Sequence, residues 1–207
     1  MDVFIPFNTR DPKSRLGEVC SREERVALAE AMLMDVLAAV EATEHTPYVL
    51  ANAPVDLDAT VIVDERSLSD AVNAMLELHD PPVSVIMADL PLVDAPTVER
   101  LTTTGGDVVL APGVGGGTNA IVVRDRAFET DFHGCSIRDH ATIAEAAGLD
   151  VTYVDSYRLG LDIDEVGDLV EVLLHAEGAA TRWLRAHGFH VEADATGRVT
   201  IGRDARV

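Results

Sequence analysis

Short runs of β-branched and other apolar residues alternate with longer segments of helical periodicity along most of this chain. The alternation indicates an α/β fold, because parallel strands need crossover connections long enough to hold a helix. The run Val83–Met87 is nearly all apolar and is typical of a central strand covered on both faces. The expected strands are Val3–Phe7, Tyr48–Ala51, Thr60–Val63, Val83–Met87, Val108–Ala111, Ala120–Val123 and Val151–Val154.

Capping and turn residues place the connecting helices. Ser21 with Glu24 three residues later predicts a helix that runs to about Glu41, and Asn8–Val19 before it is expected to be a loop. Further helices are expected at Ser67–Leu78, from about Pro96, at Ser136–Ala147 with Ser136 as its cap, at Glu165–His175 and at Thr181–His187. A hairpin is expected from Phe189–Glu192 and Val199–Ile201, turning at Thr196-Gly197.

Length and composition predict a single domain. The 207 residues are 47% hydrophobic, which is enough for one ordinary core. The segment after about residue 178 is expected to be a C-terminal appendage of that domain. No apolar run approaches a membrane span and no secretory signal is evident, so we expect a soluble, cytoplasmic protein.

The charge balance excludes some classes of function. The chain has 36 acidic and 16 basic residues, a formal net charge of −20. Such a surface repels nucleic acid and anionic membranes, so neither is expected as a partner.

Lysine is nearly absent, because Lys13 is the one lysine beside 15 arginines. An acidic surface without lysine is expected of a protein that works in concentrated salt, where repulsion between carboxylates is screened. A halophilic source is therefore our hypothesis. Lys13 is either a chance survivor or a functional residue, and the sequence alone favours neither.

Several loops follow expected strands, and ligands of open α/β sheets bind at the carboxyl ends of strands. Lys13 and Arg15 follow the first strand and could bind phosphate, although, taken by themselves, they are better explained as solvated loop charges. Asp89 ends the central strand, where a carboxylate needs a cation or a hydrogen bond. It could merely cap the turn at Leu90-Pro91; the buried strand before it favours function.

The segment Gly113–Asn119 holds three adjacent glycines, at Gly115, Gly116 and Gly117, followed by Thr118 and Asn119. Neither the Walker nor the Rossmann spacing fits it. A flexible hairpin loop is the alternative, but three consecutive glycines favour close approach of the backbone to a ligand.

Asp162 and Asp164 alternate along an extended segment, so both carboxylates face one side. Together with Asp89 they could bind Mg²⁺, which prefers oxygen ligands. A helix-capping acidic turn is the simpler alternative in so acidic a chain. A zinc site at His133, Cys135 and His140 lacks a fourth ligand and is not favoured.

Taken in order, five sets of residues carry a family resemblance: "FIPF" with "PKSRLGEVCSREERVALAEAMLMDVLAAV", "ADLPLV", "APGVGGGTNAIVV", "FHGCSIRDH" and "LGLDIDEVGDL". From about Val3 to Leu174 the chain resembles the 2-phospho-L-lactate guanylyltransferases of coenzyme F-420 biosynthesis. The resemblance implies a single domain with a nucleotide-diphospho-sugar-transferase-like fold and a mixed, mostly parallel sheet flanked by helices. It also implies GTP and 2-phospho-L-lactate as substrates, Mg²⁺ as cofactor, and a homodimer.

The resemblance also implies roles for individual residues. The metal acids correspond to Asp89, Asp162 and Asp164, the triphosphate contacts to Lys13 and Arg15, and the contacts to the phosphorylated acid to Thr118, His133 and Ser136. Two departures are Asn8-Thr9-Arg10, where many members have a lysine, and His133, where glycine is frequent.

The implied reaction is attack by a phosphate oxygen of the acceptor on the α-phosphorus of GTP, with pyrophosphate leaving. Phosphoenolpyruvate, 3-phosphoglycerate, molybdopterin or a phosphosugar as acceptor, and a nucleotide-binding module without turnover, remain alternatives.

Overall fold

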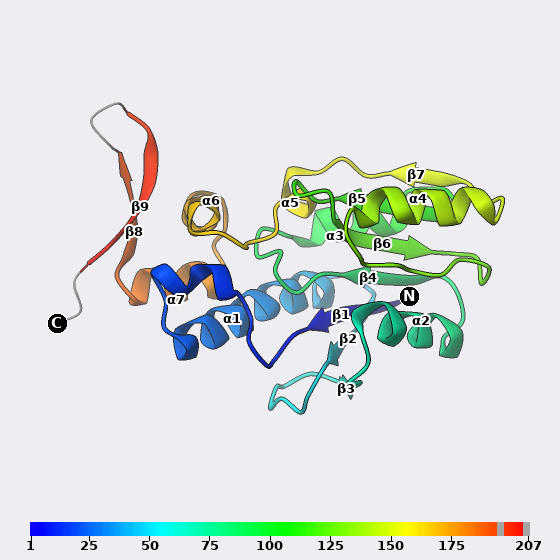
Figure 1. Ribbon diagram of the computed structural model, residues 1–207, viewed down its shortest axis with the longest axis horizontal. Helices are drawn as coiled ribbons and strands as arrows, with labels where there is room; N and C mark the ends of the chain where they lie inside the picture. Colours follow the sequence, from blue (N-terminus) through cyan, green and yellow to red (C-terminus); the bar gives the residue numbers. More distant parts are fainter. Residues whose placement is uncertain (194–196, 205–207) are drawn as a thin grey trace.

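A computed structural model describes residues 1–193 and 197–204 of the chain (Figure 1). Its centre is a seven-stranded sheet with the order β3-β2-β1-β4-β6-β5-β7. The strands are β1 (Asp2–Phe7), β2 (Thr46–Ala51), β3 (Val61–Val63), β4 (Val83–Ile86), β5 (Val108–Pro112), β6 (Thr118–Val123) and β7 (Val151–Tyr153). All the expected strands are present, with ends shifted by at most two residues.

The sheet is mixed. Strands β1, β2, β3 and β4 run parallel, and β6 is antiparallel to both of its neighbours, β4 and β5. The reversal at β6 follows from the short glycine-rich connection from β5, which can form a hairpin but not a crossover. Strand β4 is buried at every position, which confirms the prediction of a central covered strand.

Helices cover both faces of this sheet (Figure 1). Each face of the sheet has its own buried cluster, and successive residues of β1 point to opposite faces. Val3, Ile5 and Phe7 belong to the first cluster, and Phe4 belongs to the second. The helices are α1 (Arg22–Glu41), α2 (Leu68–Leu78), α3 (Ala95–Thr103), α4 (Ser136–Ala146), α5 (Tyr157–Gly160), α6 (Leu169–His175) and α7 (Ala179–Ala186), with 3₁₀ helices η1 (Ser14–Glu18) and η2 (Val166–Asp168).

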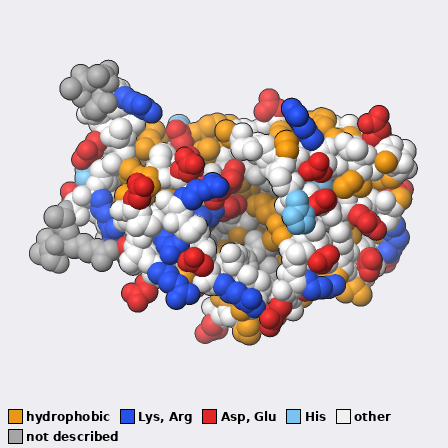
Figure 2. All heavy atoms as spheres, viewed as in Figure 1, with side chains coloured by type: hydrophobic (Ala, Val, Ile, Leu, Met, Phe, Trp, Pro, Cys, Tyr) orange, Lys and Arg blue, Asp and Glu red, His pale blue; other side chains and the backbone are white. Residues whose placement is uncertain are grey.

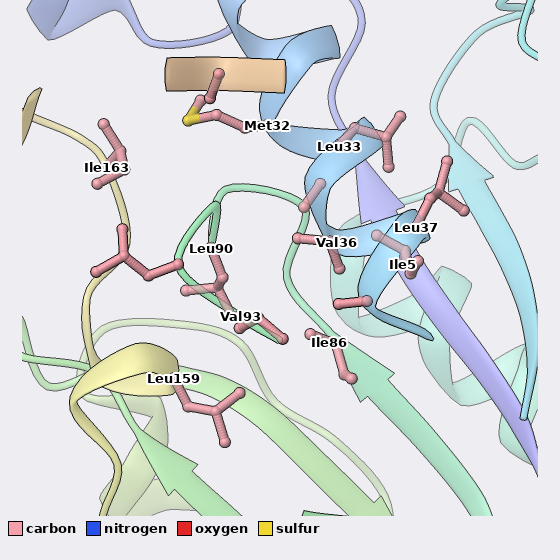
Figure 3. Packing of buried hydrophobic residues seen from close by; sticks show 14 of the residues in the cluster. Ile5, Met32, Leu33, Val36, Leu37, Ile86, Leu90, Val93, Leu159 and Ile163 are labelled. Carbon is pink, nitrogen blue, oxygen red and sulfur yellow. The ribbon is translucent and has the colours of Figure 1, made fainter. Parts of the chain in front are cut away.

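The buried hydrophobic side chains of helix α1 belong to the same cluster as Val3, Ile5 and Phe7. The predicted capping box is confirmed, because Ser21 Oγ accepts from the Glu24 amide and the Glu24 carboxylate accepts from the Ser21 amide. Figure 3 shows α1 side chains packed toward β1 and β4, with Val36 and Leu37 near Ile5 and Ile86.

Three local predictions were wrong. The loop Asn8–Val19 contains η1, and the expected helix Glu165–His175 is split into η2 and α6. Ser136 is the first residue of α4 and not its cap; Cys135 takes the cap position without a side-chain hydrogen bond. The Ser136 hydroxyl instead accepts a hydrogen bond from the Thr118 amide of β6 at 2.9 Å.

The segment after residue 178 begins as part of the main core. Ala180 and Leu184 of α7 are fully buried, and the Asp35 carboxylate on α1 accepts hydrogen bonds from the amides of Ala179 and Ala180. A β-carbon at Gly178 would lie 2.0 Å from Asp35 Oδ1, so only glycine fits there. Helix α7 is therefore integral to the domain.

Beyond α7, strands β8 (Phe189–Ala193) and β9 (Val199–Arg203) form the expected hairpin as a separate sheet that extends away from the body (Figure 1). Thr196, predicted to form the turn with Gly197, lies outside the described residues. Within residues 1–193 and 197–204, no helix has the length and apolar character needed to cross a bilayer.

Candidate active site

A cavity of about 480 Å³ opens at the carboxyl ends of β1, β2 and β4, between α1 and α2. Figure 2 shows the hollow near the middle of the viewed face, with charged side chains at its rim. Three parallel strands end at one edge of the sheet, so the residues that follow them line the same space. Those residues include Asn8 and Lys13 after β1, Asn52 after β2, and Asp89 after β4.

Lys13 lines this cavity and has an unusual backbone conformation. Its φ of 53° and ψ of 44° are left-handed, and it is the one non-glycine residue with positive φ in the described part of the chain. Such strain persists where the surroundings hold it in place. The Lys13 side chain is 8% exposed, and its Nζ lies 2.5 Å from Asp89 Oδ2 and 2.9 Å from Asp164 Oδ1.

The charge of Lys13 is stabilised by these neighbours. Burial lowers the pKa of Lys13, but the charges of Asp89 and Asp164 and their hydrogen bonds outweigh burial and leave the pKa above its usual value. The ammonium therefore stays protonated and neutralises part of the acidic cluster. Arg15, mostly exposed, adds a more distant contact at 3.4 Å to Asp164 Oδ2.

The three predicted acids come together: one carboxylate oxygen each from Asp89, Asp162 and Asp164 lies within 4.8 Å of the others. The Ile163 amide donates to the Asp89 carbonyl at 3.1 Å, and the Ile163 side chain is fully buried. This anchor holds the segment against the end of β4. The acids on either side of Ile163 consequently face the same space, as their alternation predicted.

The capping alternatives for these acids are not supported. Asp168, and not Asp162 or Asp164, accepts the amides of the acidic turn, at 2.9 Å from Asp164 and 2.7 Å from Glu165. Asp94 caps α3 by accepting from the Thr97 amide. The side-chain partner of Asp89 is Lys13, so its carboxylate is not used as a turn cap.

The chemistry of this donor set fits a divalent cation. Asp89 Oδ1 is buried and has no hydrogen-bond partner among the described residues, although Oδ2 of the same carboxylate is paired with Lys13. Burial, opposed by a hydrogen bond from Asn119 and assisted by the charge of Asp89, raises the pKa of Asp162. Crowded carboxylates with an orphaned oxygen are the ligands that a hard cation needs.

The glycine-rich loop joins β5 to β6 through a tight turn, in which the Gly113 amide donates to the Gly117 carbonyl at 2.9 Å. Gly113 is required because a β-carbon would lie 2.4 Å from Asn119 Oδ1, and Gly116 because its φ is +86°. At Gly115 a β-carbon would meet nothing within 4 Å. Packing and conformation therefore do not explain Gly115, whose backbone is left open to approach.

Asn119 joins this loop to the acids. Its Nδ2 donates to the Leu159 carbonyl at 2.9 Å and to Asp162 Oδ1 at 3.1 Å. Both amide hydrogens are thereby used inside the protein. Asn119 thereby supports the position of Asp162.

Thr118 and Ser136 lie together, whereas His133 lies apart on the surface. Ser136 Oγ accepts from the Thr118 amide, and the two hydroxyl oxygens are 3.3 Å apart. The His133 side chain is 76% exposed and pairs with Asp131, whose hydrogen bond and charge raise the pKa of His133. The structure therefore assigns His133 no contact with the other two side chains.

Residues after β2 and β3 were missed by the sequence analysis. Asn52, Asp64 and Arg66 line the cavity. Arg66 Nε donates to Asp64 Oδ1 at 2.9 Å, and this hydrogen bond lowers the pKa of Asp64. Arg10 donates to the Asn52 carbonyl at 3.3 Å. The rule that ligands bind at strand ends applies to β2 and β3 as well and could have identified these residues.

The fold is of the nucleotide-diphospho-sugar-transferase type. The crystal structure of a Desulfovibrio desulfuricans protein named as a nucleotide-diphospho-sugar transferase superposes on this chain with a TM-score of 0.73. The match covers 90% of this chain and 94% of that chain at 16% identity. That likeness shows the fold.

The sequence identifies the family. The chain belongs to the CofC-like guanylyl transferases, whose family description matches residues 1–203. It is 50% identical over 203 residues to the 2-phospho-L-lactate guanylyltransferase of Natronomonas pharaonis, covering 98% of this chain and 99% of that protein. It is also 50% identical over 203 residues to the enzyme of the same name from Halomicrobium mukohataei, covering 98% and 100%.

Proposed function

We propose that the chain transfers the guanylyl group of GTP to 2-phospho-L-lactate, giving lactyl-2-diphospho-5'-guanosine and pyrophosphate in coenzyme F-420 biosynthesis. The observation that carries this proposal is the placement of Lys13 between Asp89 and Asp164 in the lining of the cavity. A buried cation beside clustered acids suits the alignment of two anions that repel each other.

Asp89, Asp162 and Asp164 would hold Mg²⁺. When bound, the ion would neutralise charge on the triphosphate and polarise it for displacement. Lys13 would bind and orient phosphate oxygens as a compact charge, and the exposed Arg15 would add a second positive contact. Attack by the acceptor phosphate needs no protein nucleophile.

The cavity would take the nucleoside. The Asp64 side chain is 11% exposed at its wall, and Arg66, which donates to both of its carboxylate oxygens, keeps the carboxylate ionised. An ionised carboxylate can accept two hydrogen bonds from the N1–H and amino groups of guanine, whereas adenine presents an acceptor at N1. Guanine would displace part of the Arg66 pairing to reach these oxygens, and Asp64 would thereby favour GTP over ATP.

The glycine-rich loop and the start of α4 would bind the phosphorylated acid. Backbone amides near Gly115, Gly116 and Gly117 and at the N-terminus of α4 can donate to anionic oxygens, and Thr118 and Ser136 lie between them. His133 would contribute only through the backbone, because its side chain is paired with Asp131.

A homodimer, a cytoplasmic location and adaptation to high salt remain part of this proposal. The net charge of −20 and the single lysine support the salt adaptation, as do relatives from two haloarchaea. The charge also supports the expectation that neither nucleic acid nor membrane is a partner.

The test is a matrix of substrates. Purified protein in molar KCl with MgCl₂ is incubated with each nucleoside triphosphate and each acid, and released pyrophosphate is measured. The candidate acids are 2-phospho-L-lactate, phosphoenolpyruvate and 3-phosphoglycerate, with the unphosphorylated L-lactate as control. We expect release with GTP and 2-phospho-L-lactate. Faster release with another acid reassigns the acceptor, and no release from any pair supports the binding-module alternative.

A further inference from the structure

His140 is a buried, titratable residue that the proposed chemistry does not use. It lies on α4, is 0% exposed, and packs edge-on against the Phe132 ring at a centroid distance of 4.9 Å. Its Nδ1 lies 2.9 Å from Thr118 Oγ1, and its Nε2 accepts from the Asp131 amide at 3.0 Å. The imidazole therefore connects the loop before α4 with the Thr118–Ser136 pair.

These contacts fix the tautomer. The Asp131 amide can only donate, so Nε2 must be the unprotonated ring nitrogen. Burial lowers the pKa of His140 to about 4, against the smaller opposing charges of Asp131 and Asp139. The imidazole is then neutral near pH 7, its hydrogen is on Nδ1, and Nδ1–H donates to Thr118 Oγ1.

A count of hydrogens follows from this tautomer. Ser136 Oγ accepts from the Thr118 amide, and Thr118 Oγ1 accepts from His140. The single contact between the two hydroxyls can use only one of their two hydrogens. One hydroxyl hydrogen is therefore left without an acceptor in this network and can donate to a bound group. With the opposite tautomer, Thr118 would donate to Nδ1 and Ser136 to Thr118, and no hydrogen would be left.

The surroundings indicate where that hydrogen can go. The Ile137 amide, in the first turn of α4, lies 3.4 Å from the Gly116 carbonyl, so the hydroxyl pair sits between the glycine-rich loop and the N-terminus of α4. Both features favour an anion.

We propose that His140 is a positioning residue for the acceptor half of the site: its Nδ1–H keeps Thr118 Oγ1 as an acceptor, so that the Thr118–Ser136 pair can donate a hydrogen bond to an anionic oxygen of the phosphorylated acid. The inference rests on the proposed function, in which this pair contacts the acid. It adds the residue that sets the direction of the hydrogen bonds.

Two substitutions separate this role from simple support of the loop. Asparagine places a polar atom near the position of Nδ1, so His140→Asn can still donate to Thr118. Glutamine places its polar atoms near Nε2, so His140→Gln can accept from the Asp131 amide but loses the contact with Thr118. If His140 only anchored the loop, glutamine and not asparagine would preserve function.

The experiment measures pyrophosphate release by the full chain as 2-phospho-L-lactate and GTP are varied in turn. We expect His140→Gln to lower kcat/KM for the acid about tenfold, the effect of one lost hydrogen bond, with KM for GTP unchanged. His140→Asn should keep most of the parental kcat/KM for the acid. In a Thr118→Val background, His140→Gln should lower kcat/KM for the acid little further, because the contact between residues 118 and 140 is already lost.

A ¹⁵N NMR spectrum of the imidazole gives a readout independent of activity. We expect a protonated Nδ1 and an unprotonated Nε2 in the parent protein. A protonated Nε2, or better rescue by glutamine than by asparagine in an active series, overturns the inference alone. A folded parent that turns over no phosphorylated acid overturns the proposed function, and the role of His140 with it.

Discussion

The ammonium of Lys13 lies 2.5 Å from Oδ2 of Asp89, while the other oxygen of that carboxylate is buried without a partner. Lys13 follows the first strand and Asp89 the fourth, 76 residues later in the chain. The sheet order β2-β1-β4 makes these two strands neighbours and brings their carboxyl ends together. The chain's one lysine thus lies beside the end of a fully buried strand.

Lys13→Ala should lower kcat/KM for GTP by about 10² or more, because a charge-assisted contact that strengthens in the transition state is lost. Lys13→Arg is the matched second substitution, since alanine and arginine both place a β-carbon at this left-handed position, as lysine does. Arginine keeps the charge but not the compact geometry, so this variant should also be clearly impaired. Steady-state kinetics check both variants. Parental rates in both would show that the triphosphate does not bind Lys13.

Lys13→Ala should also lower the melting temperature when no divalent cation is present, because Asp89 and Asp164 are left without their shared counter-charge. Added MgCl₂ should restore much of the loss, since the ion would neutralise the same carboxylates. Scanning calorimetry with and without Mg²⁺ measures this difference.

Asp89→Asn should reduce turnover by about 10² or more and leave the fold intact, because it removes a carboxylate that would bind the metal. Asp94→Asn is the matched control, since Asp94 lies five residues later and caps α3. The control should cost about 1 kcal/mol of stability at most and leave the Mg²⁺ dependence of the rate unchanged. An active, folded Asp89→Asn with a normal Mg²⁺ dependence would remove Asp89 from the metal site.

Asp64→Asn should narrow the preference for GTP over ATP by about tenfold or more, because the amide can no longer accept both hydrogen bonds from guanine. The ratio of kcat/KM for the two nucleotides is the measurement. Glu65→Gln is the control, because Glu65 is the exposed neighbour that pairs with Arg10. An unchanged ratio in Asp64→Asn would place base recognition elsewhere.

The protein should be stabilised by salt. Its 36 acidic side chains repel one another when screening is weak, and the Debye length falls from roughly 10 Å at 0.1 M to 3 Å at 1 M. We expect the melting temperature to rise between dilute buffer and molar KCl. A melting temperature independent of KCl would contradict adaptation to high salt.

Local patterns predicted the elements of the fold well. The capping box at Ser21 and Glu24 and the alternation of strands and helices are set by neighbouring residues, so the sequence displays them. The failure at Ser136 has the opposite origin. A serine before a helical pattern is typical of a cap. Here the Ser136 hydroxyl instead accepts a hydrogen bond from the Thr118 amide, and Cys135 takes the cap position.

The acids of the site were predictable because each lies at a strand end or alternates around a buried residue. Their pairing with Lys13 was not, because it depends on the order of strands and on a left-handed residue that no local pattern predicts. Asp64 was missed because the rule on strand ends was not applied to β3. His140 was set aside because its partner Thr118 is 22 residues away and is brought to it only by the fold.

The most direct test of the account is a ³¹P NMR spectrum of the reaction of GTP, 2-phospho-L-lactate and Mg²⁺ with the protein. Guanylyl transfer predicts a pair of coupled diphosphodiester resonances that grow together with one equivalent of pyrophosphate, as GTP and 2-phospho-L-lactate disappear in equal amounts. Asp89→Asn should leave the spectrum unchanged over the same time. GDP and inorganic phosphate with the 2-phospho-L-lactate signal intact would show hydrolysis instead of transfer and would contradict the account.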